Sequence, residues 1–189
     1  MIGFGCATTS EAVFRAGAAR AIESAAELDS PLLRRHGEDA VAALCNDMLD
    51  QAAEQGDLEA FVLLAEEVSL EQDGLPAKVR GLLAADADVA LIGMAEGRRS
   101  HEVESFDGRV VVFSPSALRE LRFDSALSVP FECAVADLCH EARARGRRIV
   151  ASDLGLTRPF LCKKLGDHGR LVRGGVVVQR KWAGSCCVE

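Results

Sequence analysis

Short, continuous apolar runs alternate along this chain with longer stretches in which apolar residues recur at helical spacing. A short run that is apolar throughout predicts a strand buried on both faces, the kind found inside a parallel sheet. We expect such strands at residues 2–8, 61–65, 89–94, 109–113 and 148–152. Helical spacing predicts helices at 10–25, 38–55 and 131–145, and two more that begin near 75 and 115. This alternation predicts an α/β fold built from parallel strand–helix–strand units.

Turn signals and a valine run complete the local pattern. Asp107 and Gly108 predict a turn between an edge strand at 101–106 and the strand at 109–113. Beyond the last core strand the chain is rich in glycine and basic residues, and three consecutive valines predict one more strand at 176–178. This last part is expected to form a tail on the domain.

Two carboxylates directly follow the central predicted strand. Glu66 and Glu67 come after the apolar run at 61–65. Ligands of open α/β sheets bind beyond the carboxyl ends of the strands, so these side chains lie where such a sheet places its chemistry. Paired carboxylates there can hold a hard divalent cation, which prefers oxygen ligands and bridges phosphates. The alternative is a solvated acidic turn, and the strand pattern does not decide between the two.

Composition narrows the class of protein. The 189 residues suffice for one ordinary domain, and an apolar fraction of 49% argues against disorder. A net charge of −7 makes nucleic acid an unsuitable partner, because phosphate binding requires positive surface. No apolar run is long enough to span a bilayer, and the N-terminus lacks the features of a signal peptide. The seven scattered cysteines then indicate a cytoplasmic protein with free thiols.

Two further features suggest ligand contacts. Gly3 and Gly5 partly match the dinucleotide-binding fingerprint, but Thr8 stands where the third glycine belongs. A nicotinamide-dependent enzyme is therefore one alternative function. It also needs an acidic residue at the end of the second strand. Asn46 lies among the apolar positions of the helix at 38–55, where an amide must find partners. It predicts either a structural hydrogen bond or a contact with a ligand.

Six segments follow one another in a recognisable order. They are CNDMLDQA from residue 45, AFVLLAEEVSL from 60, KVRGLLAADADVALIGM from 78, FDGRVVVFSPSALRELRFDSAL from 106, ADLCHEARARGRRIVASDL from 136, and the KW pair at 181–182. This order resembles family-2-type glycosyltransferases of the GT-A fold. The resemblance covers most of residues 40–182 and is strongest in 105–153. Each segment alone is moderately specific, and their order is much more so.

The resemblance implies a three-layer α/β domain whose mostly parallel central sheet carries helices on both faces. This domain is expected over residues 1–155, with a nucleotide-binding half at 1–95 and an acceptor-side half at 96–155. Residues 156–189 are then a tail that packs on the domain or on a partner. The family also implies a nucleotide-diphosphate sugar as donor and an acceptor that the sequence does not identify, and it allows a homodimer.

The resemblance also assigns site residues. The base and ribose of the donor are expected near the end of the first strand, and a divalent metal, Mn²⁺ or Mg²⁺, on the acidic motif after the central strand. Glu67 is the better placed of the two glutamates to hold a metal that bridges the diphosphate, although the family usually carries aspartates there. The expected nucleotide-sugar contacts are Ala7, Thr8, Glu11, Asn46, Asp107 and Gly108, and the expected metal ligands are Glu66 and Glu67.

The family's catalytic base comes from an acidic pair near the start of the helix at 131–145. Asp137 is retained, but Val135 occupies the preceding acid position, and Glu132 lies about one helical turn earlier. The histidine that often follows the last core strand is also absent. The resemblance therefore implies either an inverting transferase with Asp137 or Glu132 as base, or a non-catalytic GT-A-like module that binds a nucleotide or a partner protein. These alternatives differ in whether an acid of the metal motif shares a pocket with Glu132 or Asp137.

Overall fold

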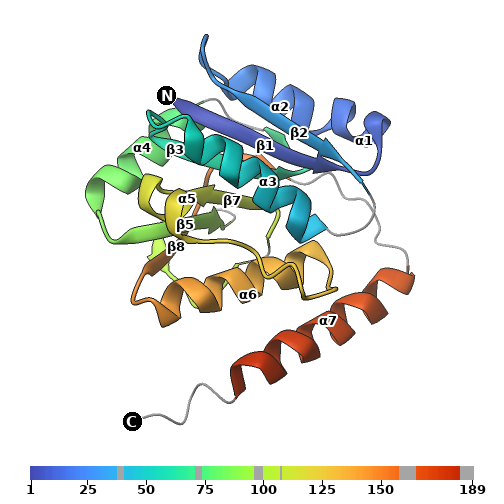
Figure 1. The fold of residues 1–189 in the computed structure, drawn as a ribbon. Helices are drawn as coiled ribbons and strands as arrows, with labels where there is room; N and C mark the ends of the chain where they lie inside the picture. The colour runs from blue at the N-terminus through green and yellow to red at the C-terminus, as the bar shows by residue number, and fades with distance from the viewer. Residues whose placement is uncertain (38–40, 71–73, 96–99, 107, 158–164, 184–189) are drawn as a thin grey trace.

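A seven-stranded sheet forms the middle of the part of the chain that the structure describes (Figure 1). This computed structural model describes residues 1–37, 41–70, 74–95, 100–106, 108–157 and 165–183. The strands of the sheet are β1 Ile2–Thr8, β2 Leu32–His36, β3 Ala60–Ala65, β5 Val89–Met94, β6 His101–Glu102, β7 Val110–Phe113 and β8 Arg148–Ser152. They lie in the order β2-β1-β3-β7-β5-β8-β6. The sheet is mostly parallel, and only β7 and β6 among these strands run antiparallel to their neighbours.

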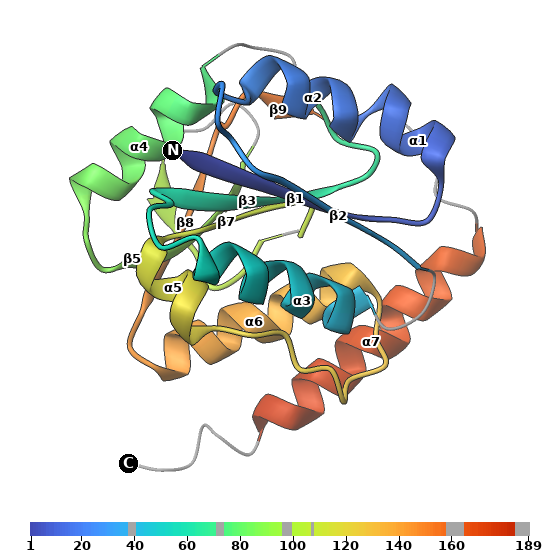
Figure 2. The same cartoon turned by 45° about the horizontal axis from the view of Figure 1, so that its top comes forward.

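Helices cover both faces of the sheet, which gives three layers (Figure 2). The helices are α1 Glu11–Ala16, α2 Ala18–Ala25, α3 Val41–Glu54, α4 Leu75–Ala85, α5 Pro115–Glu120, α6 Phe131–Ala144 and α7 Leu165–Ala183. Residues of α1, α2 and α4 share a core with one face of the sheet, and residues of α3, α5 and α6 share a core with the other. The architecture confirms the expected three-layer α/β fold.

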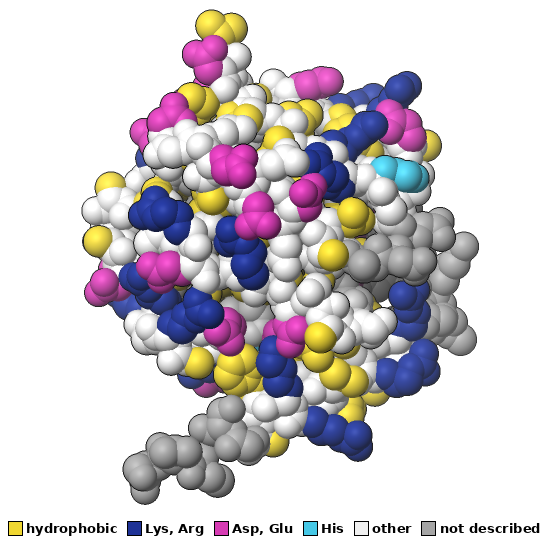
Figure 3. Space-filling model, in the orientation of Figure 1, with side chains coloured by type: hydrophobic (Ala, Val, Ile, Leu, Met, Phe, Trp, Pro, Cys, Tyr) yellow, Lys and Arg dark blue, Asp and Glu magenta, His cyan; other side chains and the backbone are white. Residues whose placement is uncertain are grey.

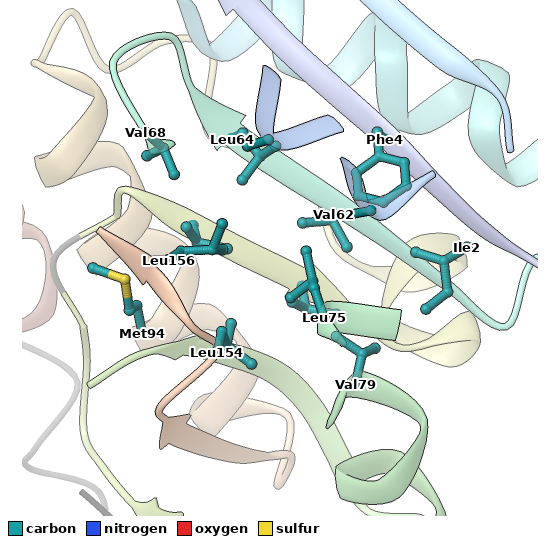
Figure 4. Packing of buried hydrophobic residues seen from close by; sticks show 14 of the residues in the cluster. Ile2, Phe4, Val62, Leu64, Val68, Leu75, Val79, Met94, Leu154 and Leu156 are labelled. Atoms are coloured by element: carbon teal, nitrogen blue, oxygen red, sulfur yellow. The ribbon is translucent and has the colours of Figure 1, made fainter. Parts of the chain in front are cut away.

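Alternate side chains of the central strands point into two separate cores. On one face, Ile2 and Phe4 of β1 meet Val62 and Leu64 of β3 and the buried side of α4 (Figure 4). On the opposite face, Phe61 packs among residues of α3, α5 and α6. Because both faces of these strands are buried, they are apolar at nearly every position, and this is the pattern from which the sequence predicts them.

Gly3 and Gly5 lie within β1 and not in a turn that ends it. A Cβ on Gly5 would lie 2.6 Å from Cζ of Phe61, and a Cβ on Gly3 would lie 3.0 Å from Cδ2 of the same ring. The two glycines therefore make room for an aromatic ring against the sheet. Since a dinucleotide fingerprint needs its glycines in the turn between strand and helix, their placement argues against the nicotinamide alternative.

The expected strand at 176–178 is wrong, because these three valines lie in the middle of α7. Val178 is buried, and Gly174, one helical turn earlier, lies against Cys133 of α6. A Cβ on Gly174 would be only 2.7 Å from the Cys133 sulfur, so glycine permits the close approach of the two helices. Packing at helical spacing outweighs the strand preference of consecutive valines.

Other boundaries also differ from expectation. β6 pairs with β8 at the edge of the sheet and forms no hairpin with β7, and Asp107 lies outside the described residues. The helix expected at 10–25 is divided into α1 and α2 at Gly17. β4 Ser69–Leu70 and β9 Leu156–Thr157 form a small antiparallel sheet. Such two-residue strands are too short to show a hydrophobic period.

Polar contacts attach α7 to α6. Lys181 Nζ lies 2.8 Å from Oδ2 of Asp137 and 2.9 Å from Oδ2 of Asp124. Trp182 Nε1 donates a 2.7 Å hydrogen bond to Oδ1 of Asp137, and the indole stacks on His140. Both oxygens of the buried Asp137 carboxylate therefore have partners on α7, which lies beside α6 in both ribbon views (Figures 1 and 2).

Acidic and basic side chains are interspersed over the face shown in Figure 3. Many acidic and basic side chains of the described residues form exposed ion pairs, such as Arg80 with Glu27 and Glu59, each at 2.7 Å. Exposed pairs of this kind contribute little stability individually, because water screens them. Among the described residues, no helix is both long enough and apolar enough to cross a bilayer.

Candidate functional site

A pocket of about 160 Å³ lies beyond the carboxyl ends of β1 and β3. Its apolar lining comes mainly from α3, β3 and the start of α6, and includes Val41, Cys45, Leu63, Leu64 and Phe131. Its polar lining consists of Thr9, Glu66, Glu67, Arg109 and Glu132. Of the site residues expected from the sequence, the pocket brings together Ala7, Glu66, Glu67, Gly108 and Glu132.

The topology explains why these polar groups meet. β1 and β3 are parallel, so their carboxyl ends lie at the same edge of the sheet. β7 runs antiparallel to β3, so the residues that precede it lie at that edge too, and Ala65 N donates a 2.8 Å hydrogen bond to Arg109 O. α6 also begins there, with Glu132 in its first turn. Glu67, Arg109 and Glu132, which are far apart in sequence, thus line one pocket.

Glu66 connects the end of β3 to the loop between β1 and α1, hereafter the β1–α1 loop. Its carboxylate accepts hydrogen bonds from Thr9 N at 2.8 Å, Ser10 N at 2.9 Å and Thr9 Oγ1 at 2.6 Å. Ser10 in turn caps α1, because its hydroxyl accepts from Val13 N. The sequence indicates that Glu66 lies at the ligand-binding edge, and the structure adds that its oxygens already have protein donors.

Among the described residues, three of the expected nucleotide contacts lie outside the pocket lining, namely Asn46, Thr8 and Glu11. Thr8 is buried, and its hydroxyl donates to Arg35 O at 3.2 Å. Glu11 is exposed and pairs with Arg15 at 2.7 Å and with Arg34 at 2.9 Å. The hydrogen bond from Arg15, assisted by the charge of Arg34, lowers the pKa of Glu11. Their expected contacts with the base and ribose stay predictions.

Asn46 makes a pair of hydrogen bonds with one residue of a distant loop. Its Nδ2 donates to Phe123 O at 2.9 Å, and its Oδ1 accepts from Phe123 N at 2.8 Å. The amide therefore satisfies both backbone groups of Phe123 and joins α3 to the segment after α5. The structural role that the sequence allowed for Asn46 is present, and a contact with a ligand stays a prediction.

Asp137 lies against α7 and is not part of the pocket lining. Lys181, whose ammonium group Asp137 shares with Asp124, has a shifted pKa. Burial lowers the pKa of Lys181, but the hydrogen bonds that its ammonium group donates to Asp137 and Asp124 outweigh burial and raise it. The same bond from Lys181 lowers the pKa of Asp124. Of the two acids predicted as base, Glu132 therefore lines the pocket and Asp137 does not, and both roles stay predictions.

The cysteines near the pocket are buried thiols. Burial raises the pKa of Cys45 to about 12, and it also raises the pKa of Cys6. Metal-ligating cysteine is a thiolate, so these groups are poor ligands at neutral pH. In the described part of the chain, no three Asp, Glu, His or Cys side chains are grouped so as to hold a metal ion.

Sequence reasoning missed several residues of the pocket, notably Arg109 and Phe131. Phe131 directly precedes Glu132 at the start of α6. The acid in the first turn of a predicted helix was therefore a usable signal for Phe131 too. Arg109 gave no comparable signal, because its position at this edge depends on β7 being antiparallel. A strand read from its apolar run alone carries no information about its direction.

Comparison with known protein sequences identifies a distant relative. No model of a protein family matches the chain. The streptomycin biosynthesis protein StrF of Streptomyces griseus is 24% identical over 183 residues. The match covers 82% of this chain and 64% of the relative, so the chain spans slightly less than two thirds of that protein's length.

Solved structures share the fold. Glucosyl-3-phosphoglycerate synthase of Mycobacterium tuberculosis, in complex with Mn²⁺, UDP and phosphoglyceric acid, matches with a TM-score of 0.65 and 12% identity over 96% of this chain and 78% of its own. A mannosyltransferase of Pyrobaculum calidifontis, in complex with GDP-Man and Mn²⁺, matches with a TM-score of 0.64 and 13% identity over 95% and 64%. The chain therefore has the GT-A fold of nucleotide-sugar transferases.

Proposed function

We propose that this protein is a glycosyltransferase that moves a sugar from a nucleotide-diphosphate sugar to an acceptor hydroxyl group. The observation that carries the proposal is the common pocket of Glu67 and Glu132 beyond the carboxyl ends of β1 and β3. Ligands of open α/β sheets bind at this edge, and the structural neighbours were solved with UDP or GDP-Man and with Mn²⁺. A carboxylate for a metal and a carboxylate for a proton are the two groups that such a reaction needs.

The donor diphosphate fits the polar side of the pocket. Arg109 offers a planar cation that suits phosphate oxygens. Glu67 offers a hard oxygen donor, which suits Mn²⁺ or Mg²⁺. A site with one or two protein carboxylates is typical of a cation that arrives with a phosphate ligand and keeps several waters, so the donor set fits this kind of metal. When bound, the cation supplies positive charge that stabilises the departing diphosphate.

Glu132 is the proposed general base. It accepts the proton of the acceptor hydroxyl while the acceptor oxygen forms a bond to the anomeric carbon of the donor sugar. The bond from that carbon to the diphosphate breaks at the same time, and the nucleoside diphosphate leaves with the electron pair. Attack from the face opposite the leaving group inverts the anomeric carbon. Asp137 belongs to this proposal only as the second candidate for base.

A second function is a nucleotide- or protein-binding module without catalysis. Two observations favour it. Val135, at the position where the family carries its preceding acid, is fully buried. Asp137, the acid that is retained, has both oxygens bound by Lys181 and Trp182. If Glu132 does not replace these groups, the protein keeps a nucleotide site and lacks a base.

Thermal unfolding with nucleotides tests the binding step. The melting temperature is measured with UDP and with GDP, each with and without Mn²⁺. A nucleotide that binds the folded state raises the melting temperature. We expect one of the two nucleotides to give a shift that requires Mn²⁺ and that Glu67→Gln abolishes. Glu54→Gln is the matched control, because Glu54 is an exposed glutamate at the end of α3. A nucleotide shift indifferent to both Mn²⁺ and Glu67 would contradict the metal-assisted mechanism.

The catalytic step is tested with nucleotide sugars of the nucleotide that binds in the unfolding experiment, either UDP-sugars or GDP-sugars. Release of free nucleoside diphosphate, with water or an added alcohol as acceptor, reports transfer. Glu132→Gln is expected to lower the rate by about 10²-fold or more and to leave the Mn²⁺-dependent binding shift in place. Binding without turnover in the wild type would instead support the non-catalytic module.

A further inference from the structure

The carboxylate of Glu66 uses most of its hydrogen-bonding capacity inside the protein. Two backbone N–H groups, of Thr9 and Ser10, donate to Oε2, and the Thr9 hydroxyl donates to Oε1. A carboxylate has about four lone-pair positions, so three donors at 2.6–2.9 Å leave little room for a further partner. Bonds to an ionised acceptor are also stronger than bonds between neutral groups.

The backbone of Glu66 and Glu67 also contacts the segment that joins α1 to α2. Ala18 N donates to Glu66 O at 3.1 Å. Gly17 lies so close to this segment that a Cβ there would be 2.6 Å from Glu66 O and 2.9 Å from the carbonyl carbon of Glu67. Side chain and main chain together therefore fix the start of α1 and of α2 against the end of β3. Thr9, which lines the pocket, is held in place by these contacts.

We infer that the two adjacent glutamates have different tasks. Glu66 is a positioning residue that holds Thr9 and the β1–α1 loop at the pocket wall, and Glu67 is the glutamate of this pair that faces a divalent cation. A cation on Glu66 would compete with the donors of Thr9 and Ser10 for the same carboxylate oxygens. The task of Glu67 rests on the proposed function, and the task of Glu66 does not.

Glutamine at position 66 separates a positioning role from a metal-binding role. In Glu66→Gln, the amide oxygen can accept from the N–H groups of Thr9 and Ser10, while Nε2 donates to the Thr9 hydroxyl. The loop contacts are then kept, whereas the negative charge that attracts a cation is lost. Glu66→Ala removes both the contacts and the charge. Glu67→Gln is the matched substitution on the neighbouring residue.

The first measurement is thermal unfolding of the protein without ligand. We expect Glu66→Ala to lower the melting temperature by about 4–8 °C and Glu66→Gln by less than about 2 °C. Thr9→Val removes the hydroxyl donor, so it is expected to destabilise the wild type and to have little further effect in Glu66→Ala. Glutamine as harmful as alanine, or additive effects of Thr9→Val and Glu66→Ala, would overturn the positioning role.

The second measurement is the Mn²⁺-dependent part of the UDP or GDP shift in the same variants. We expect it to persist in Glu66→Gln, with affinity within about threefold of the wild type, and to disappear in Glu67→Gln. The opposite pattern would assign the cation to Glu66 and overturn the division of tasks. If the wild type shows no Mn²⁺-dependent shift, the role of Glu67 fails with the proposed function, while the ligand-free measurement still decides the role of Glu66.

Discussion

The absence of one side-chain atom at Gly17 allows this residue to pack against the backbone of Glu66 and Glu67, beside the pocket. A side chain at this position meets backbone atoms of Glu66 and Glu67, which cannot rotate out of the way. We expect Gly17→Ala to cost about 1–3 kcal/mol of unfolding free energy, because overpacking must displace the end of β3. Chemical denaturation measures this cost, and the nucleotide shift is expected to weaken with it because Glu67 moves.

Gly81→Ala is the control for this substitution. Gly81 lies within α4, and no heavy atom lies within 4 Å of the position that its Cβ would take. Alanine there is expected to leave stability unchanged or to raise it by about 0.5–1 kcal/mol, since it restricts the unfolded chain and suits a helix. Equal effects of the two substitutions would show that the contact of Gly17 with the Glu66 backbone does not matter.

At the residue scale, the sequence predicts types of contact better than partners. Ser114 followed by Pro115 predicts a helix start, and the Ser114 hydroxyl does accept from Ala117 N. An amide among apolar residues predicts that Asn46 needs partners, but only the fold shows that Phe123 supplies both. The hydrogen bonds that Glu66 accepts from Thr9 and Ser10 are likewise invisible in sequence, because they depend on where the β1–α1 loop lies.

At the element scale, the attachment of α7 to α6 is the contact with a distinct pH dependence. Lys181→Met removes the ammonium shared by Asp124 and the buried Asp137. We expect a loss of about 1–3 kcal/mol, below the usual cost of breaking a fully buried pair because Lys181 is one-third exposed. Arg180→Met, an exposed cation one position earlier, is the control. The fluorescence of Trp182, the chain's only tryptophan, reports the attachment.

The difference between wild type and Lys181→Met is expected to vary with pH. Lys181 lowers the pKa of Asp124, so this contribution is present above the ordinary carboxyl value of 3.8 and is lost as pH falls through the lower folded value. The pKa of Lys181 is raised, so its contribution is present below 10.5 and is lost as pH rises through the higher folded value. A difference that stays constant at both extremes would contradict the ion-pair origin.

Elements with both faces buried are predictable because their apolar runs are continuous, and β1, β3 and β5 begin and end close to the expected residues. α7 was missed because three consecutive valines favour a strand locally, whereas the fit of Gly174 against Cys133 is a tertiary contact. The break between α1 and α2 was also missed because it depends on a tertiary contact. Gly17 interrupts a helical period because the end of β3 lies against it.

At the scale of the whole molecule, strand order and direction lie beyond the hydrophobic pattern. The antiparallel β7 between β3 and β5 brings Arg109 to the edge where the parallel strands end. The order of the six segments, through the resemblance to GT-A enzymes, indicated this fold, and the structural neighbours confirm it. The pocket itself forms only when the ends of β1 and β3 and the starts of β7 and α6 meet.

This convergence gives a prediction for the protein as a whole. A nucleotide with Mn²⁺ that occupies the pocket contacts segments from all of these elements, and it stabilises only the folded arrangement. Amide hydrogen exchange is therefore expected to slow together near Thr9, Glu67, Arg109 and Glu132, and to change little in α4, whose contacts lie in the opposite core. Glu67→Gln is expected to abolish the protection at all four places. Protection confined to one of them, or found instead along α7, would place the nucleotide outside this pocket.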